Sequence, residues 1–230
     1  MSSSTKLGDP NLRFQQAVAH FEAGRFQDAE TLLADLAPLL SSEPDFQRLR
    51  GLVAARLNDG ARALECLGRA VALNPASPAS QFELAEQLRR NGKLADAERH
   101  YRETVALDRK NVAPRLALAR LLNRLGRAGE AKAELLSAAE SAAHKPDDLI
   151  KLAITARDLG HAGLAVRQLR RFLELVPGHF EAEALMRDLQ TSQVRPWHFR
   201  MMNDQPRNRA YDAALRRAIG PDSHVLEIGT

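Results

Sequence analysis

The sequence predicts an all-α solenoid of stacked helical hairpins, followed by the first helix and first strand of a second domain. Two observations lead to this prediction. Small and apolar residues recur at a spacing of 34 across residues 10–179, and after residue 190 this period gives way to a polar linker, a helical pattern and a short apolar run. Periods of roughly 20–50 residues are typical of solenoids, in which each unit packs against its neighbours.

Composition indicates an ordinary globular protein. The chain has 230 residues with 44% hydrophobic content, enough to bury a sizeable core. No run of about 18 apolar residues occurs, and the N-terminus lacks the apolar region of a signal peptide, so we expect no membrane partner. The single cysteine, Cys66, excludes an internal disulfide and a multi-cysteine zinc site. We expect a reducing compartment, the cytoplasm.

The charge of the chain is modestly positive and carried mainly by arginine. The formal net charge is +4, with 27 arginines and six lysines. Aromatic residues make up 5% of the chain, too few for a surface that stacks nucleic-acid bases, so we expect no nucleic-acid partner. The seven histidines are scattered without a metal-binding motif, so no metal site is expected.

Four columns of residues recur at the spacing of 34. Two columns are small: Ala17, Gly51, Ala85, Ala119, Ala153 and Ala29, Ala63, Ala97, Ala131, Ala165. A third is turn-forming: Gly24, Asn58, Gly92, Gly126, Gly160. The fourth is large: Leu33, Leu67, Tyr101, Leu135, Leu169.

These columns predict a helical hairpin in each unit. The small residues allow two helices to cross closely, and the turn column supplies the left-handed residue that ends the first helix. The large column fills the space between units. Pro75 and Pro177 mark breaks between one unit and the next, because proline cannot continue a helix.

The columns and their period resemble the tetratricopeptide repeat, which has about 34 residues. Five units result, at residues 10–43, 44–77, 78–111, 112–145 and 146–179. The resemblance implies a right-handed α-solenoid. Residues 1–9 are then a flexible tail, and residues 180–190, with apolar residues at helical spacing, are expected to form a helix that caps the stack.

The resemblance also implies a concave groove lined by the first helix of each unit, which binds a protein or peptide. The groove positions select Arg48, Arg56, Arg89, Arg90, Arg120, Arg124 and Arg157. The opposing charges there are Asp45, Glu86, Asp147 and Asp158. A net positive groove suits an acidic or C-terminal peptide segment, because guanidinium groups pair with carboxylates. Alternatively, these are solvated arginines of an arginine-rich chain.

A different pattern follows the repeats. Residues 191–197 are short, polar and contain a proline, as expected of a linker. Asn203 or Asp204 can cap a helix that ends at Gly220–Pro221, and Val225–Ile228 reads as a strand that leads into Gly229. A helix, a turn and a strand entering a glycine are how a Rossmann-like nucleotide-binding domain begins.

Residues 198–230 resemble the first segment of the catalytic domain of protein arginine methyltransferases. The resemblance is carried by His198, Met201, Asp204, Arg207 and Tyr211, followed by the V-L-E-I-G run of residues 225–229. The order of domains is similar to the branch of that family with tetratricopeptide repeats ahead of a class I methyltransferase domain, whose cofactor is S-adenosyl-L-methionine.

The resemblance implies roles for individual residues. Arg207 would bind the carboxylate of S-adenosylmethionine, and Glu227 and Gly229 would belong to the cofactor-binding strand and loop. His198 and Met201 would lie near the site of methyl transfer. The family's substrate-binding glutamates have no counterpart in these residues, so we expect the 230-residue chain alone to be inactive and to bind the cofactor weakly.

Two functions therefore remain open. The first is an enzyme, a protein arginine methyltransferase whose repeats recruit a partner or substrate protein. The second is a tetratricopeptide adaptor protein with only a vestigial methyltransferase segment. Coding sequence beyond Thr230 would distinguish them, because the enzyme requires a Gly-x-Gly loop and an acidic residue about 20 positions later.

Overall fold

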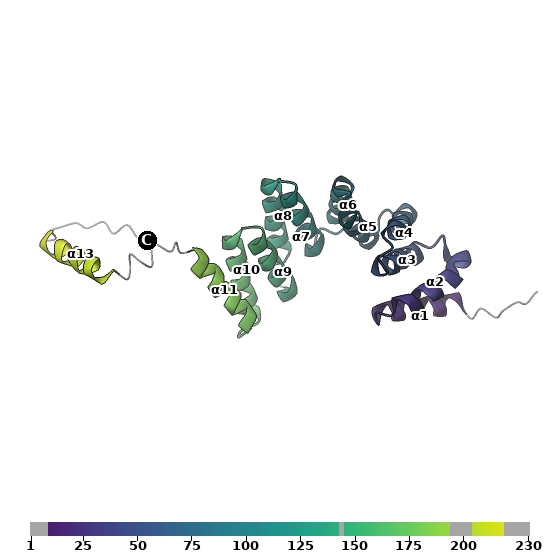
Figure 1. Cartoon of the computed structure of the whole chain (residues 1–230), viewed down its shortest axis with the longest axis horizontal. Helices are drawn as coiled ribbons and strands as arrows, with labels where there is room; N and C mark the ends of the chain where they lie inside the picture. The colour runs from purple at the N-terminus through teal and green to yellow at the C-terminus, as the bar shows by residue number, and fades with distance from the viewer. Residues whose placement is uncertain (1–8, 143–144, 194–203, 219–230) are drawn as a thin grey trace, which may run out of the picture. The chain divides into compact units, whose positions relative to one another are not determined.

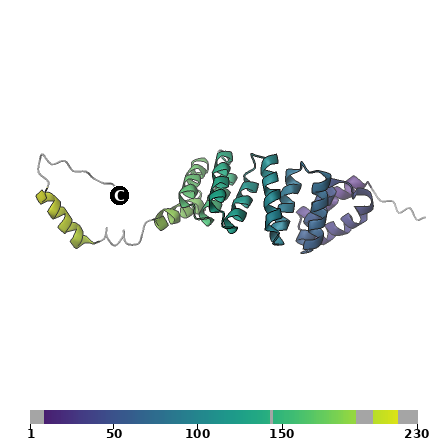
Figure 2. The same cartoon turned by 90° about the horizontal axis from the view of Figure 1, so that it is seen from above.

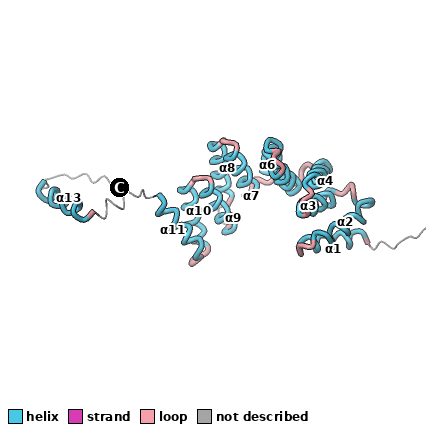
Figure 3. The backbone as a smooth tube through the Cα atoms, viewed as in Figure 1, coloured by secondary structure: helices cyan, strands magenta, loops and turns pink. Residues whose placement is uncertain are grey.

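The computed structural model describes residues 9–142, 145–193 and 204–218. Helices and the short turns and loops that join them account for all of these residues, and no strand occurs among them (Figure 3). The chain divides into two compact units, Met1–Val176 and Pro177–Thr230. Each unit is described by itself below.

Five antiparallel helical hairpins make up the first unit (Figure 1). Their first helices are α1 (Pro10–Glu22), α3 (Pro44–Arg56), α5 (Pro78–Arg90), α7 (Val112–Arg124) and α9 (Pro146–Asp158). Their second helices are α2 (Phe26–Leu40), α4 (Gly60–Leu73), α6 (Leu94–Leu107), α8 (Ala128–Ser141) and α10 (Ala162–Leu175). The first helices thus begin at the first residues of the five predicted repeats.

The hairpins stack in chain order. Each second helix packs against the first helix of the next hairpin, and neighbouring first helices also meet, α1 with α3, α3 with α5, and α7 with α9. Figure 2 shows this unit from a second direction, with the hairpins following one another in the same sequence. The first helices of these pairs therefore lie side by side, as the predicted solenoid requires.

Proline and polar caps begin the first helices, and left-handed residues end them. Four of the five first helices have proline as their first residue, where its missing N–H costs no hydrogen bond. The whole turn column, Gly24 to Gly160, has positive φ between 63° and 80°. The predicted left-handed turn is confirmed in all five repeats.

The other three columns lie in the core. Every residue of the two small columns is buried, and the large column, from Leu33 to Leu169, is at most 1% exposed. Two buried glutamines add polar links between repeats. Gln47 donates its side-chain N–H to the carbonyl of Ser41 at 2.6 Å, and Gln81 donates to that of Pro75 at 2.9 Å. Each glutamine thus stabilises the turn that precedes the first helix of its own repeat.

The second unit contains two described helices, α11 (Phe180–Gln193) and α13 (Gln205–Ala218). The predicted helix after Asp204 is present. The helix after the repeats is longer than expected, since α11 continues three residues beyond residue 190 into the range assigned to the linker. That α11 caps the stack stays a prediction. The expected strand at 225–228, most of the linker and residues 1–8 of the tail lie outside the described residues.

Candidate functional site

Two cavities open between the first helices of repeats 2, 3 and 4. The α3–α5 cavity has a volume of about 300 Å³, and the α5–α7 cavity about 250 Å³. Helix α5 forms one wall of each, and Glu86 lines both. The two cavities therefore follow one another along the surface that the sequence assigns to the groove.

Apolar side chains form the floor of the α3–α5 cavity. Leu52, Ala55 and Phe82 are half-buried there, above the fully buried Leu67. The polar lining consists of Arg56, Glu83, Glu86, Gln87 and Arg90. Two arginines thus face two glutamates, so the formal charges of this lining cancel.

Three arginines gather at the α5–α7 cavity. Arg89 comes from α5, and Arg120 and Arg124 come from α7, with Ala117 and Leu121 buried beneath them. Glu86 is the single acidic residue of this lining. The cavity therefore has an excess of positive charge, as the sequence predicted for the groove as a whole.

Glu86 is already satisfied by groups of its own repeat. Tyr101, buried in α6, donates its hydroxyl to Glu86 Oε1, and Arg89 donates to Glu86 Oε2 at 2.8 Å. Burial raises the pKa of Glu86, but the hydrogen bonds from Arg89 and Tyr101 outweigh it, and the pKa lies below the usual value. Burial and the Glu86 carboxylate raise the pKa of Tyr101, so its hydroxyl remains a donor.

Glu83 is the less satisfied carboxylate of the pair. Burial raises its pKa above the usual value, although the nearby charges of Arg48 and Arg56 oppose that rise. The structure gives Glu83 no hydrogen bond or ion pair within the described part of the chain. Glu83 and Glu86 therefore differ in chemistry despite lying one turn apart on α5.

The predicted groove arginines fall into three groups. Arg89, Arg120 and Arg124 meet at one cavity, and Arg56 and Arg90 at the other. The other two predicted residues line neither cavity: Arg48 lies 3.6 Å from Asp45 and Arg157 lies 2.8 Å from Asp158, each within its own helix.

Three of the predicted arginines, Arg56, Arg90 and Arg124, have no ion pair or hydrogen bond among the described residues. Arg56 lies over the Phe21 ring, 5.8 Å from its centroid, and Arg120 donates to Thr155 Oγ1 at 2.6 Å. Sequence reasoning missed Phe82, which lines the α3–α5 cavity, and Tyr101, which binds Glu86; their ring centroids lie 5.9 Å apart. Tyr101 was visible as the one hydroxyl-bearing member of the large column.

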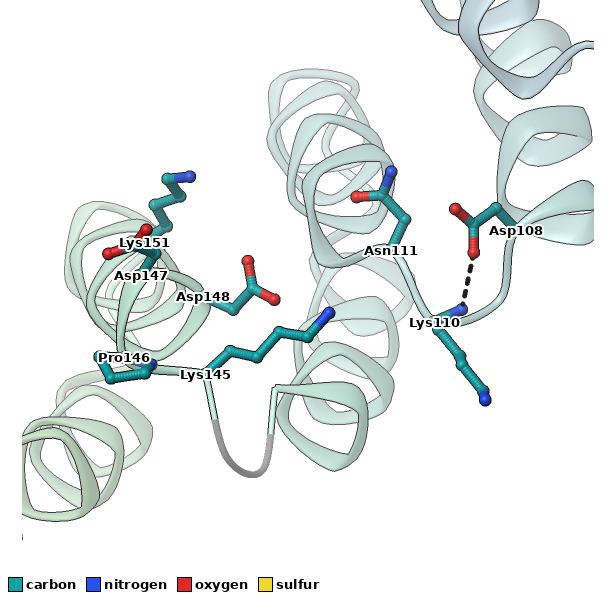
Figure 4. A pocket seen from close by; sticks show the side chains of 8 residues that line it. All are labelled: Asp108, Lys110, Asn111, Lys145, Pro146, Asp147, Asp148 and Lys151. Carbon is teal, nitrogen blue, oxygen red and sulfur yellow. Dashed lines mark hydrogen bonds between the residues drawn. The ribbon is translucent and has the colours of Figure 1, made fainter. Parts of the chain in front are cut away.

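A larger cavity of about 580 Å³ lies elsewhere, between the turn before α7 and the start of α9. Its lining mixes three aspartates, three lysines, Asn111 and Pro146. In Figure 4 the Lys145 and Asp148 side chains extend towards the Asp108–Asn111 turn, whereas the Lys110 side chain points away. Opposite charges alternate around this space, so it has no net preference for an anion or a cation.

The residues assigned to a cofactor give little geometry. Arg207 lies in the first turn of α13, and nothing is described of its side chain. His198, Met201, Glu227 and Gly229 lie outside the described residues. None of the helices described is long and apolar enough to cross a membrane. Within the same residues, no three His, Cys, Asp or Glu side chains gather as a metal site would require.

Comparison with family models gives consistent matches along the repeats. Models described as tetratricopeptide repeat match residues 14–78, 48–112 and 88–153, and together they span residues 14–153. These matches end before residue 198, so they give no support to a methyltransferase segment. No curated protein sequence matches the chain.

Solved structures share the fold at low sequence identity. TTC0263, a thermophilic TPR protein of Thermus thermophilus, is 18% identical with a TM-score of 0.59, covering 80% of this chain and 100% of its own. MamA of AMB-1 is 20% identical with a TM-score of 0.55, and the match covers 74% of this chain and 92% of MamA. YrrB, described as a TPR protein with an unusual peptide-binding site, is 16% identical with a TM-score of 0.54, covering 78% and 92%. At these identities the likeness shows the fold alone.

Proposed function

Because the chain belongs to the tetratricopeptide repeat family, we propose that it is a protein-interaction module whose first helices bind an acidic segment of a partner protein. The observation that carries this proposal is the pair of exposed arginines, Arg90 and Arg124, which have no ion pair among the described residues and lie at two adjacent cavities. Guanidinium groups left unpaired beside a cavity favour a carboxylate ligand.

The alternative, that these are merely solvated arginines, is opposed by the position of Arg90 and Arg124 at two adjacent cavities. Arginines in or next to the second helices join neighbouring repeats: Arg102 and Arg127 bind Glu98 and Glu130 at 2.6 to 3.0 Å. By contrast, Arg167 and Arg170 on α10 have no ion pair or hydrogen bond among the described residues, so the adjacent cavities, and not the missing partners alone, distinguish Arg90 and Arg124.

Charge reversal tests the proposal. An array of peptides of about 15 residues should yield binders enriched in aspartate and glutamate, and the double variant Arg90→Glu/Arg124→Glu should bind them roughly tenfold or more weakly. The matched control is Arg167→Glu/Arg170→Glu on α10, which makes the same change in net charge on exposed residues away from both cavities. Equal loss in both variants, or binders without acidic enrichment, would reject an acidic ligand.

A second candidate function rests on the sequence of residues 198–230. The frame of His198, Met201, Asp204, Arg207 and Tyr211 supports an arginine methyltransferase whose repeats recruit its partner or substrate. Arg207 would then hold the carboxylate of S-adenosylmethionine, the methyl donor, assisted by Glu227 and Gly229. Titration of the 230-residue chain with S-adenosylmethionine by calorimetry should show no tight binding. Micromolar affinity would contradict the expectation that these residues are insufficient alone.

A further inference from the structure

The two groove cavities differ in what they offer a ligand. The α3–α5 cavity combines an apolar floor of Leu52, Ala55 and Phe82 with a lining whose charges cancel. A bulky apolar side chain that enters it would exchange water contact for apolar contact without meeting an excess of either charge. Such burial is favourable roughly in proportion to the apolar area removed from water.

The α5–α7 cavity offers an anion site instead. Glu86 accepts a hydrogen bond from Tyr101 on one oxygen and from Arg89 on the other, so Arg89 already balances its charge within this lining. Arg120 has a neutral partner, Thr155, and Arg124 has no hydrogen bond or ion pair among the described residues. One unengaged guanidinium beside one partly engaged guanidinium suits a single carboxylate, which pairs with arginine bidentately.

The geometry sets the separation between the two ligand groups. Both cavities use α5 as a shared wall and lie on opposite sides of it, so their centres are about one helix diameter apart, roughly 10–12 Å with side chains. An extended peptide advances about 3.3 Å per residue. About three residues of extended chain therefore reach from one cavity to the other.

We propose that the groove recognises a two-part motif in its partner, a bulky apolar side chain in the α3–α5 cavity and an aspartate or glutamate side chain about three residues away in the α5–α7 cavity. This inference rests on the proposed function and adds the chemistry and spacing of the ligand. The acidic group is a side chain of an internal peptide segment, because the row of first helices continues from α7 to α9, which contact each other.

Synthetic peptides test the spacing directly. The probes are fluorescent peptides of about 12 residues, long enough to cross both cavities when extended, acetylated and amidated at their ends. Each contains one Phe and one Glu in a Gly, Ser and Ala background, in both orders, at separations from one to six residues. Fluorescence polarisation should show the tightest binding near a separation of three. Replacing Phe with Ala or Glu with Gln in that peptide should weaken binding several-fold to tenfold.

Variants of the protein assign each half of the motif to its cavity. Arg124→Gln should abolish the preference for Glu over Gln while keeping the preference for Phe over Ala. Ala55→Leu, which fills the α3–α5 cavity, should abolish the preference for Phe over Ala while keeping the preference for Glu over Gln. Leu52→Ala is a second variant of that cavity should Ala55→Leu fail to fold, and Arg170→Gln is the matched control for the lost charge.

The outcomes separate this inference from the function on which it rests. Binding that depends on Arg124 but not on spacing or on Phe overturns the two-part motif and leaves an acidic-peptide module. Binding that depends on neither Arg90 nor Arg124 overturns both the two-part motif and the proposed function. Tighter binding of a phosphoserine peptide overturns the carboxylate assignment, and equal binding of a peptide whose only anion is a free C-terminus overturns the internal side chain.

Discussion

Repeats 2 and 3 share a backbone frame but differ at the point where their two helices cross. Repeat 2 places Gly51 on α3 against Leu67 on α4, whereas repeat 3 places Ala85 on α5 and Tyr101 on α6 at the equivalent positions. A Cβ atom on Gly51 would lie 2.6 Å from Leu67 Cγ and 3.1 Å from the Leu67 backbone nitrogen. The helices of repeat 2 therefore cross too closely to admit even alanine without adjustment.

The difference extends from the core into the groove. The residue after the small position is Leu52 in repeat 2 and Glu86 in repeat 3, and Glu86 is the one carboxylate at this position among the five repeats. Repeat 3 is also the one repeat with tyrosine in the large column, and that tyrosine bonds Glu86. A substitution in the core thus sets the chemistry of the groove, whereas the same two positions in repeat 2 are apolar and line the α3–α5 cavity.

The largest expected effect is at the crossing in repeat 2. Leu67→Ala should lower the free energy of unfolding by about 2–5 kcal/mol, because a fully buried leucine leaves a cavity. Gly51→Ala should lower it by about 1–3 kcal/mol through overpacking, despite the better helix propensity of alanine. The double variant should lose less free energy of unfolding than the sum of the two single losses, since the truncated Leu67 makes room for the new methyl group. Urea unfolding measures all three.

The control for this cycle is Leu135→Ala in repeat 4, where the small position is already Ala119. Combining it with Gly51→Ala should give additive losses, because the two sites belong to different hairpins. Stabilisation by Gly51→Ala alone would contradict the close crossing.

A smaller loss is expected from the corresponding residue of repeat 3. Tyr101→Phe keeps the ring and removes the hydroxyl that Glu86 accepts, which should cost about 1–3 kcal/mol because a partly buried carboxylate loses a donor. Adding Glu86→Leu makes this site resemble repeat 2 and should recover part of the loss, since both partners are then apolar. Equal stability of Tyr101→Phe and the wild type in urea unfolding would show that the hydrogen bond contributes nothing.

The pH dependence of stability should also distinguish the repeats. The pKa of Glu86 is lowered in the folded state, so the folded protein binds fewer protons at this group than the unfolded chain. Its contribution is fully present above the unfolded value of about 4.3 and is lost as the pH falls through the folded pKa. Glu86→Gln should therefore lose less stability than the wild type on acidification through this window. Glu103→Gln, an exposed control on α6, should keep the wild-type slope.

Much of this comparison could be predicted from the sequence, because the repeat multiplies each signal five times. The columns predicted the hairpins, the left-handed turns and the buried positions, since one backbone geometry imposes the same steric demand in every unit. The turn column is the clearest case: even Asn58, which departs from glycine, has a positive φ.

The details of the groove could not be predicted in the same way. Helical position placed Arg89, Arg120 and Arg124 on one surface, but it did not show whether each arginine was already paired. Arg157 pairs with its neighbour Asp158, and Arg48 lies near Asp45, whereas Arg124 has no ion pair among the described residues. Side-chain pairing depends on rotamers and on neighbours from other helices, so residue spacing alone does not determine it.

The smallest effect concerns the turns that follow the crossing helices. Repeat 2 has Asn58 at φ 63° where repeat 3 has Gly92 at φ 75°, and this region costs non-glycine residues roughly 1 kcal/mol or more, asparagine least. In urea unfolding, Asn58→Gly should therefore raise the free energy of unfolding by less than about 1 kcal/mol, because glycine also gains entropy in the unfolded chain. Gly92→Asn should lower it by a similar amount, and Gly92→Ala should lower it more. Since the added Cβ at Gly92 meets no atom within 4 Å, any loss there reports backbone conformation and not packing, in contrast to Gly51.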